Sequence, residues 1–167
     1  MLSINLNYFT NIYSIWMQVT VEWDKDDPVM LKTALASGGR GMELSELVVF
    51  NGNLLSFDDR TGAIYQLENK NSYPWVLLPD GPGKVSKGFK SEWATVKDRF
   101  LYVGGLGKAW TTPTGELVNY HPQYIKKVSP SGEVTHIDWH LRYESLARAA
   151  GIVSPGKLMR NFSISQF

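Results

Sequence analysis

The sequence contains no cysteine among its 167 residues. This absence excludes disulfide bridges and thiolate metal sites, but it leaves the redox compartment open because secreted proteins can do without disulfides. An excess of either charge is also missing, since 17 basic and 16 acidic residues give a formal charge of +1. A chain so near neutrality has no global field that attracts nucleic acid or an anionic membrane. We therefore expect no nucleic-acid partner.

Long hydrophobic runs are absent as well. Residues 1–18 are apolar and aromatic, but polar side chains such as Ser3, Asn5 and Asn7 interrupt them too often for a membrane span. The same stretch has no basic n-region and no small-residue cleavage site, so no signal peptide is visible. We expect no membrane segment in this chain. The composition, with 43% hydrophobic and 20% charged residues, is typical of one folded globular domain.

The chain does contain a succession of short β-type runs separated by turns. Leu47–Phe50 and Leu54–Phe57 flank Asn51-Gly52, a dipeptide that type I′ hairpin turns favour because both positions need positive φ. The turn-rich segment 58–62 follows, and Ala63–Leu67 is predicted to be the next strand. This pattern predicts an antiparallel all-β fold.

The strand pattern repeats after 47 residues when Ser45 is laid over Glu92. Strand, turn and strand then coincide, with 47–49 on 94–96, 51–52 on 98–99 and 54–56 on 101–103. A period in the forties with about four short strands per unit is typical of β-propeller blades. A β-sandwich is the alternative, because two hairpins of any all-β protein can be aligned when the sequence offset between them is chosen freely.

Two later segments extend this prediction. Tyr124–Val128 and 133–137, joined by the turn 129–132, are predicted to repeat the strand, turn and strand around Asp59. The segment 140–150 has apolar residues at helical spacing and ends at a glycine, which indicates a short inserted helix.

Ser45 and Glu92 are the first candidates for chemistry. In a propeller the innermost strands face a shared axis, so the repeat would bring these two equivalent positions to one point. Hydroxyl, carboxylate and backbone oxygens select calcium or magnesium over zinc or copper. The alternative is structural, with Glu92 capping a strand and Ser45 filling a small space, and spacing alone favours that alternative.

The segment Asp58-Asp59-Arg60-Thr61-Gly62 is the second candidate. Two adjacent carboxylates beside an arginine could activate a water molecule and hold a phosphate group. Asp-rich turns also occur for purely structural reasons, because Asp side chains satisfy local backbone donors. The turn by itself leaves both interpretations open.

Five stretches, taken together and in order, resemble the soluble calcium-activated nucleotidase, or apyrase, family. They are Val21–Asp26, Gly39–Ser45, Phe57–Gly62, Lys87–Trp93 and Tyr102–Lys108. The similarity extends nearly without gaps from about Val19 to about Met159. It implies a five-bladed propeller with one calcium ion (Ca2+) in its central tunnel, and hydrolysis of UDP, GDP, ADP and the matching triphosphates.

The resemblance also implies roles for particular residues. Ser45 and Glu92 match metal ligands of the family, and they are the same two residues that the repeat brings to the axis. Asp59 is similar to a family residue needed for hydrolysis. Bound calcium would neutralise negative charge that develops on the phosphate, and Asp59 would orient the attacking water.

The chain departs from the family pattern at both ends. Five repeats of this length need about 235 residues, so we expect an incomplete five-bladed β-propeller of about two to three blades. Residues 1–18 are a divergent N-terminal segment, 19–159 a partial apyrase propeller domain, and 160–167 a divergent C-terminal tail. We expect a truncated product that binds calcium weakly and hydrolyses little.

Location and partners rest on the resemblance alone. It implies a secreted protein or one of the ER or Golgi lumen, a nucleotide substrate, and a homodimer for the full-length family member. The alternative function is a non-catalytic propeller fragment that acts as a protein-interaction module.

Overall fold

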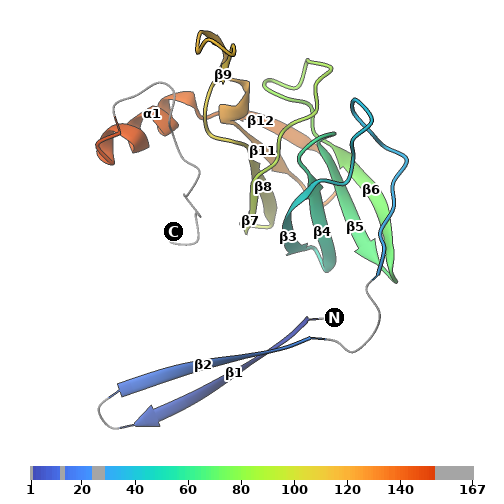
Figure 1. Cartoon of the computed structure of the whole chain (residues 1–167), viewed down its shortest axis with the longest axis vertical. Helices are drawn as coiled ribbons and strands as arrows, with labels where there is room; N and C mark the ends of the chain where they lie inside the picture. The colour runs from blue at the N-terminus through green and yellow to red at the C-terminus, as the bar shows by residue number, and fades with distance from the viewer. Residues whose placement is uncertain (1, 12–13, 24–28, 153–167) are drawn as a thin grey trace. The chain divides into compact units, whose positions relative to one another are not determined.

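The computed structural model describes residues 2–11, 14–23 and 29–152 and divides the chain into two units, Met1–Met30 and Leu31–Phe167. In the first unit, β1 (Leu2–Asn11) and β2 (Ser14–Trp23) pair as an antiparallel hairpin (Figure 1). The predicted tail 160–167 lies outside the described residues.

The second unit contains two four-stranded antiparallel sheets (Figure 1). The first sheet has the order β3 (Leu44–Phe50), β4 (Asn53–Asp58), β5 (Ala63–Glu68) and β6 (Asn71–Leu77). The second has β7 (Trp93–Lys97), β8 (Phe100–Gly104), β11 (Tyr124–Val128) and β12 (Val134–Asp138), again as neighbours in that order. The fold is therefore mostly β-sheet, as predicted.

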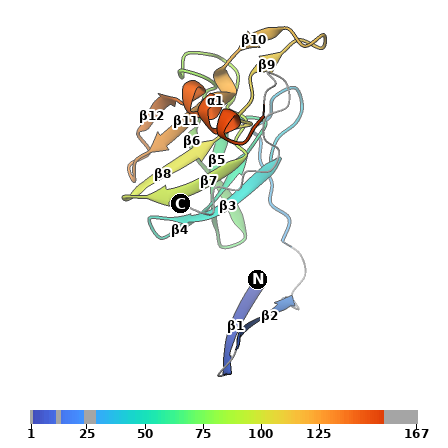
Figure 2. The same ribbon diagram turned by 90° about the vertical axis from the view of Figure 1, so that its left-hand side faces the viewer.

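A small insertion separates β8 from β11. It consists of the strand pair β9 (Trp110–Thr111) and β10 (Leu117–Asn119), followed by the 3-10 helix η1 (His121–Gln123). Helix α1 (His140–Ala149) follows β12 and confirms the predicted short helix (Figure 2). No helix among the described residues is long and apolar enough to cross a bilayer.

The first hairpins of the two sheets confirm the 47-residue repeat. Asn51 and Gly52 have φ values of 48° and 79°, and their counterparts Asp98 and Arg99 have φ values of 50° and 64°. Both turns thus have the two positive φ values that a type I′ hairpin requires. The first strands β3 and β7 lie beside each other, so the two sheets meet through equivalent elements (Figures 1 and 2). The described residues form two such sheets and no closed ring.

The predicted equivalence of Tyr124–Val128 with the strands around Asp59 is wrong. Strands β11 and β12 are third and fourth in their sheet, so they correspond to β5 and β6 rather than to β4 and β5. Strand β6 carries Pro74, which weakens the strand signal but is tolerated because β6 is an edge strand. The insertion before β11 also lengthens the second sheet's segment of the chain, so the 47-residue offset no longer aligns the last two strands of the two sheets.

The core lies where the two sheets pack together. Its fully buried residues come from both sheets and from the segments that leave them: Phe57, Ile64, Leu78, Phe89, Leu101, Val103 and Val128. Burial of each such side chain stabilises the fold by about 1.5–3 kcal/mol. Phe89 lies in the connection between the sheets, so its burial holds the segment before β7 against the first sheet.

Gly62 offers a test of this packing. It has φ +78°, and an added Cβ would lie 2.2 Å from the Leu78 carbonyl oxygen and 2.7 Å from the Phe89 nitrogen. We expect Gly62→Ala to lower the free energy of unfolding by about 3 kcal/mol or more, since backbone strain and a backbone clash coincide. The matched control is Gly52→Ala, with φ +79° and open space, which should cost about 1 kcal/mol. Urea denaturation measures both, and equal losses would contradict the packing described.

Candidate functional site

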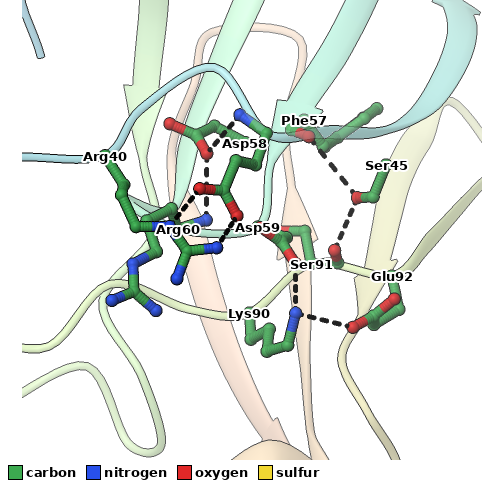
Figure 3. Close-up of polar contacts among 10 residues, drawn as sticks. Arg40, Ser45, Phe57, Asp58, Asp59, Arg60, Lys90, Ser91 and Glu92 are labelled. Carbon is green, nitrogen blue, oxygen red and sulfur yellow. Dashed lines mark hydrogen bonds and ion pairs between the residues drawn. The ribbon is translucent and has the colours of Figure 1, made fainter. Parts of the chain in front are cut away.

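The candidate site lies at the end of the two sheets where β3 and β7 begin and β4 ends (Figure 3). Antiparallel order brings these three strand ends together although they are far apart in sequence. Three predicted residues are found here: Ser45 at the start of β3, Asp59 directly after β4, and Glu92 directly before β7. The structure therefore gathers the residues that the sequence singled out.

Ser45 links the two sheets through its hydroxyl group. Its Oγ donates to the carbonyl oxygen of Ser91 at 2.6 Å and lies 3.4 Å from the carbonyl oxygen of Phe57. Ser91 is buried and precedes Glu92 in the chain. Ser45 is thus held beside the Glu92 backbone, in an environment of hydroxyl and carbonyl oxygens.

Lys90 joins the two acidic residues of the site. Its ammonium group is hydrogen-bonded to Asp59 Oδ2 and lies 3.0 Å from Glu92 Oε1 (Figure 3). The exposed fractions of the side chains are 32% for Lys90, 17% for Asp59 and 35% for Glu92. Burial acts to lower the pKa of Lys90, but the two carboxylates outweigh it and raise this pKa above its ordinary value. The three side chains form one partly buried ionic cluster.

The sequence pattern did not single out Lys90. Its place in the motif Lys87–Trp93, two residues before Glu92, was the available signal. That signal points to Lys90 only when it is known that the turn with Asp59 lies next to the segment before β7.

Asp58 has a structural role, whereas the adjacent Asp59 belongs to the ionic cluster. Its fully buried carboxylate accepts hydrogen bonds from the backbone N–H groups of Met42, Glu43 and Arg60 at 2.9–3.2 Å, and from the Thr61 hydroxyl at 2.6 Å. Burial acts to raise the pKa of Asp58, but these four donors outweigh it and hold the pKa below its ordinary value. Asp58 therefore locks the turn after β4 to the segment that enters β3.

Met42 shows how closely that segment is held. It is a non-glycine residue with φ 53°, a left-handed conformation that costs free energy. The hydrogen bond from its N–H group to Asp58 compensates part of this cost. The backbone N–H of Asp59 donates to the Glu43 carbonyl oxygen at 3.0 Å, so the same segment also fixes Asp59.

Asp59 keeps one carboxylate oxygen for further contacts. Its Oδ2 is paired with Lys90, whereas Oδ1 is buried and has no hydrogen-bond donor among the residues that the structure describes. A buried acceptor without a donor costs about 1–3 kcal/mol. Oδ1 is therefore suited to accept a hydrogen bond from a water molecule or a ligand.

Further basic side chains lie in the neighbourhood of Asp59. Arg40 and Arg60 lie near the aspartates in Figure 3, and Arg40 makes a two-point ion pair with Glu43 at 2.6 Å. Burial is the main cause that lowers the pKa of Lys87; the negative charge of Asp80 opposes this shift, and the positive charges of Arg60 and Lys90 add to it. Such a collection of cations is suited to a phosphate group.

The donor set fits calcium in kind. The hydroxyl of Ser45, the carboxylate of Glu92 and neighbouring backbone carbonyl groups are all oxygen donors, which calcium prefers, but calcium takes about six to eight of them. In the described part of the chain, no group of three or more His, Cys, Asp or Glu residues has a geometry that could hold a metal ion. These residues could supply part of a calcium shell.

Comparison with known proteins gives consistent matches. Residues 8–164 match the family model described as apyrase. The chain is 58% identical over 142 residues to soluble calcium-activated nucleotidase 1 of Rattus norvegicus, which covers 85% of this chain and 35% of the relative. It is 54% identical over 139 residues to an apyrase of Cimex lectularius and 56% identical over 139 residues to apyrase apy-1 of Caenorhabditis elegans, each covering 83% of this chain. The chain spans 35–39% of the length of these relatives.

The buried carboxylate of Asp58 gives a testable dependence on pH. Its pKa is lower in the folded than in the unfolded state, so its contribution is complete above about pH 4 and is lost as the pH falls through the folded-state pKa. We expect Asp58→Asn to lower the free energy of unfolding by about 2–3 kcal/mol at pH 7, because the amide cannot accept all four hydrogen bonds.

The difference between parent and Asp58→Asn should shrink in acid, where the parent carboxylate becomes protonated. Urea denaturation between pH 3 and pH 7 measures this. Glu116→Gln is the control, because Glu116 is exposed and the change should stay within about 0.5 kcal/mol. A difference for Asp58→Asn that is independent of pH would contradict the proposed charge state.

Proposed function

Because the chain belongs to the apyrase family, we propose that it takes part in calcium-dependent hydrolysis of nucleoside di- and triphosphates, with UDP, GDP and ADP as substrates. The products are the lower phosphates and inorganic phosphate. The observation that carries this proposal is the convergence of Ser45, Asp59, Lys90 and Glu92 at one end of the paired sheets (Figure 3).

We assign Ser45 and Glu92 as calcium ligands. Both offer oxygen atoms on adjoining parts of β3 and the segment before β7, and the Ser45 hydroxyl already contacts a backbone carbonyl beside Glu92. Bound calcium would neutralise negative charge on the phosphate as it develops in the transition state.

Asp59 is proposed as the residue that aligns the attacking water. Its Oδ1 is a buried acceptor, and the backbone contact with Glu43 and the pairing with Lys90 fix the carboxylate in place. Positioning of this kind is the main contribution of protein groups to phosphoryl transfer. Arg60 and Lys87 supply positive charge for the phosphate groups of the substrate.

We propose that the two sheets are consecutive blades of a five-bladed β-propeller. Each has four antiparallel strands, they repeat after 47 residues, and they meet through their first strands. In this arrangement water and further blades complete the calcium shell, so the 167-residue chain alone should bind calcium weakly. The ionic cluster favours this enzyme function over a non-catalytic interaction module. An interaction module does not need two carboxylates paired with one partly buried lysine.

From the family resemblance we also propose that the protein works outside the cell or in the lumen of the ER or Golgi. A homodimer of the full-length family member stays a prediction.

The proposed roles can be separated in a chimaera in which this chain replaces the matching third of the rat relative. Glu92→Gln should weaken calcium affinity and lower activity together, because a carboxylate ligand is lost. Asp59→Ala should lower turnover at least about 100-fold with calcium affinity nearly unchanged. Phosphate release from UDP and calcium titration calorimetry measure the two effects.

Glu116→Gln is the control and should leave both quantities unchanged, since Glu116 is exposed on the segment before β10. Phosphate release that continues in the presence of a chelator would refute the calcium-dependent function. Normal turnover in the Asp59→Ala variant would refute the catalytic assignment.

A further inference from the structure

We propose that Lys90 sets the calcium affinity of this site by competing with the metal ion for Glu92. The inference rests on the proposed function, because it takes Glu92 as a calcium ligand. It adds a role for a residue of this chain that neither binds the metal nor attacks the substrate.

The competition follows from the contacts of the Lys90 ammonium group. Its Nζ lies 3.0 Å from Glu92 Oε1, so the two groups form an ion pair. A carboxylate oxygen that is engaged by an ammonium group is less available to a cation. Calcium that binds Glu92 must therefore displace this contact or share the carboxylate with it.

Electrostatic repulsion adds to the competition. A calcium ion on Glu92 would lie within a few ångströms of a second positive charge, and solvent screens that repulsion only in part because about two thirds of the Lys90 side chain is buried. Both effects act in one direction, so Lys90 raises the calcium concentration that the site needs.

Asp59 gives Lys90 a second anchor. Because Lys90 is also hydrogen-bonded to Asp59 Oδ2, the ammonium group keeps a partner when Glu92 turns to the metal. The partly buried Asp59 carboxylate likewise stays paired. Lys90 is thus a positioning residue that acts on calcium loading through its contact with Glu92, and it raises the calcium concentration at which the site fills.

Calcium titration without nucleotide tests this inference. Binding of calcium chloride is measured by calorimetry, or by the calcium-dependent rise in melting temperature, in the chain and in the chimaera with the rat relative. The neutral variants Lys90→Met and Lys90→Gln should lower the calcium dissociation constant about tenfold. Lys97→Met is the matched control, because this exposed lysine ends β7 away from the site, and it should stay within about twofold.

Lys90→Arg provides an independent measurement that preserves the charge. Arginine can hold a carboxylate with two parallel hydrogen bonds, so this variant should bind calcium no more tightly than the parent. Tenfold tighter binding by the Arg variant would overturn the proposal, whether or not the neutral variants fold. Circular dichroism verifies folding of each variant.

The outcomes separate this inference from the proposed function. If the parent chimaera binds calcium, Glu92→Gln weakens the binding and neutral variants of Lys90 leave it unchanged, only the role of Lys90 is refuted. If the parent chimaera binds no calcium, the metal assignment fails and the role of Lys90 fails with it.

Discussion

The hydrogen bonds that converge on the buried Asp58 carboxylate are the interaction on which the candidate site depends. They connect the end of β4, the turn that follows and the Met42–Glu43 segment that enters β3. A buried charge is stable only when it is compensated in this way. Because one aspartate performs this structural task, the adjacent Asp59 is left to face Lys90.

The contact between the two sheets determines where the chemistry lies. Phe57 and Phe89 are fully buried in the core. Asp59, two residues after Phe57, pairs with Lys90, which directly follows Phe89. Burial of apolar side chains thus positions Asp59 opposite Lys90. The polar cluster is therefore a consequence of how the core packs. The Ser45 hydroxyl connects β3 to the segment before β7 by its hydrogen bond to the Ser91 carbonyl oxygen.

Much of the local structure could be predicted, because it depends on neighbouring residues. Asn51-Gly52 specified its hairpin through backbone conformation, and the 47-residue repeat identified the equivalent turn at Asp98-Arg99 although neither residue there is a glycine. The strand around Pro74 was missed, and β11 and β12 were matched to the wrong strands. Strand β6 is an edge strand whose pairing with β5 outweighs the poor local propensity of proline.

The sequence by itself determined the β-rich class, the first hairpin of each sheet and the short helix, because turn chemistry and helical spacing are local properties. The resemblance carried by the family motifs selected Ser45, Asp59 and Glu92 as candidates, because motif residues are read along the chain without knowledge of its contacts. Only the tertiary structure decided that Asp58 is buried and structural while Asp59 is paired with Lys90. Ion pairs and burial depend on residues about thirty positions apart. Such distances are set by the packing of two sheets, and no local pattern encodes them.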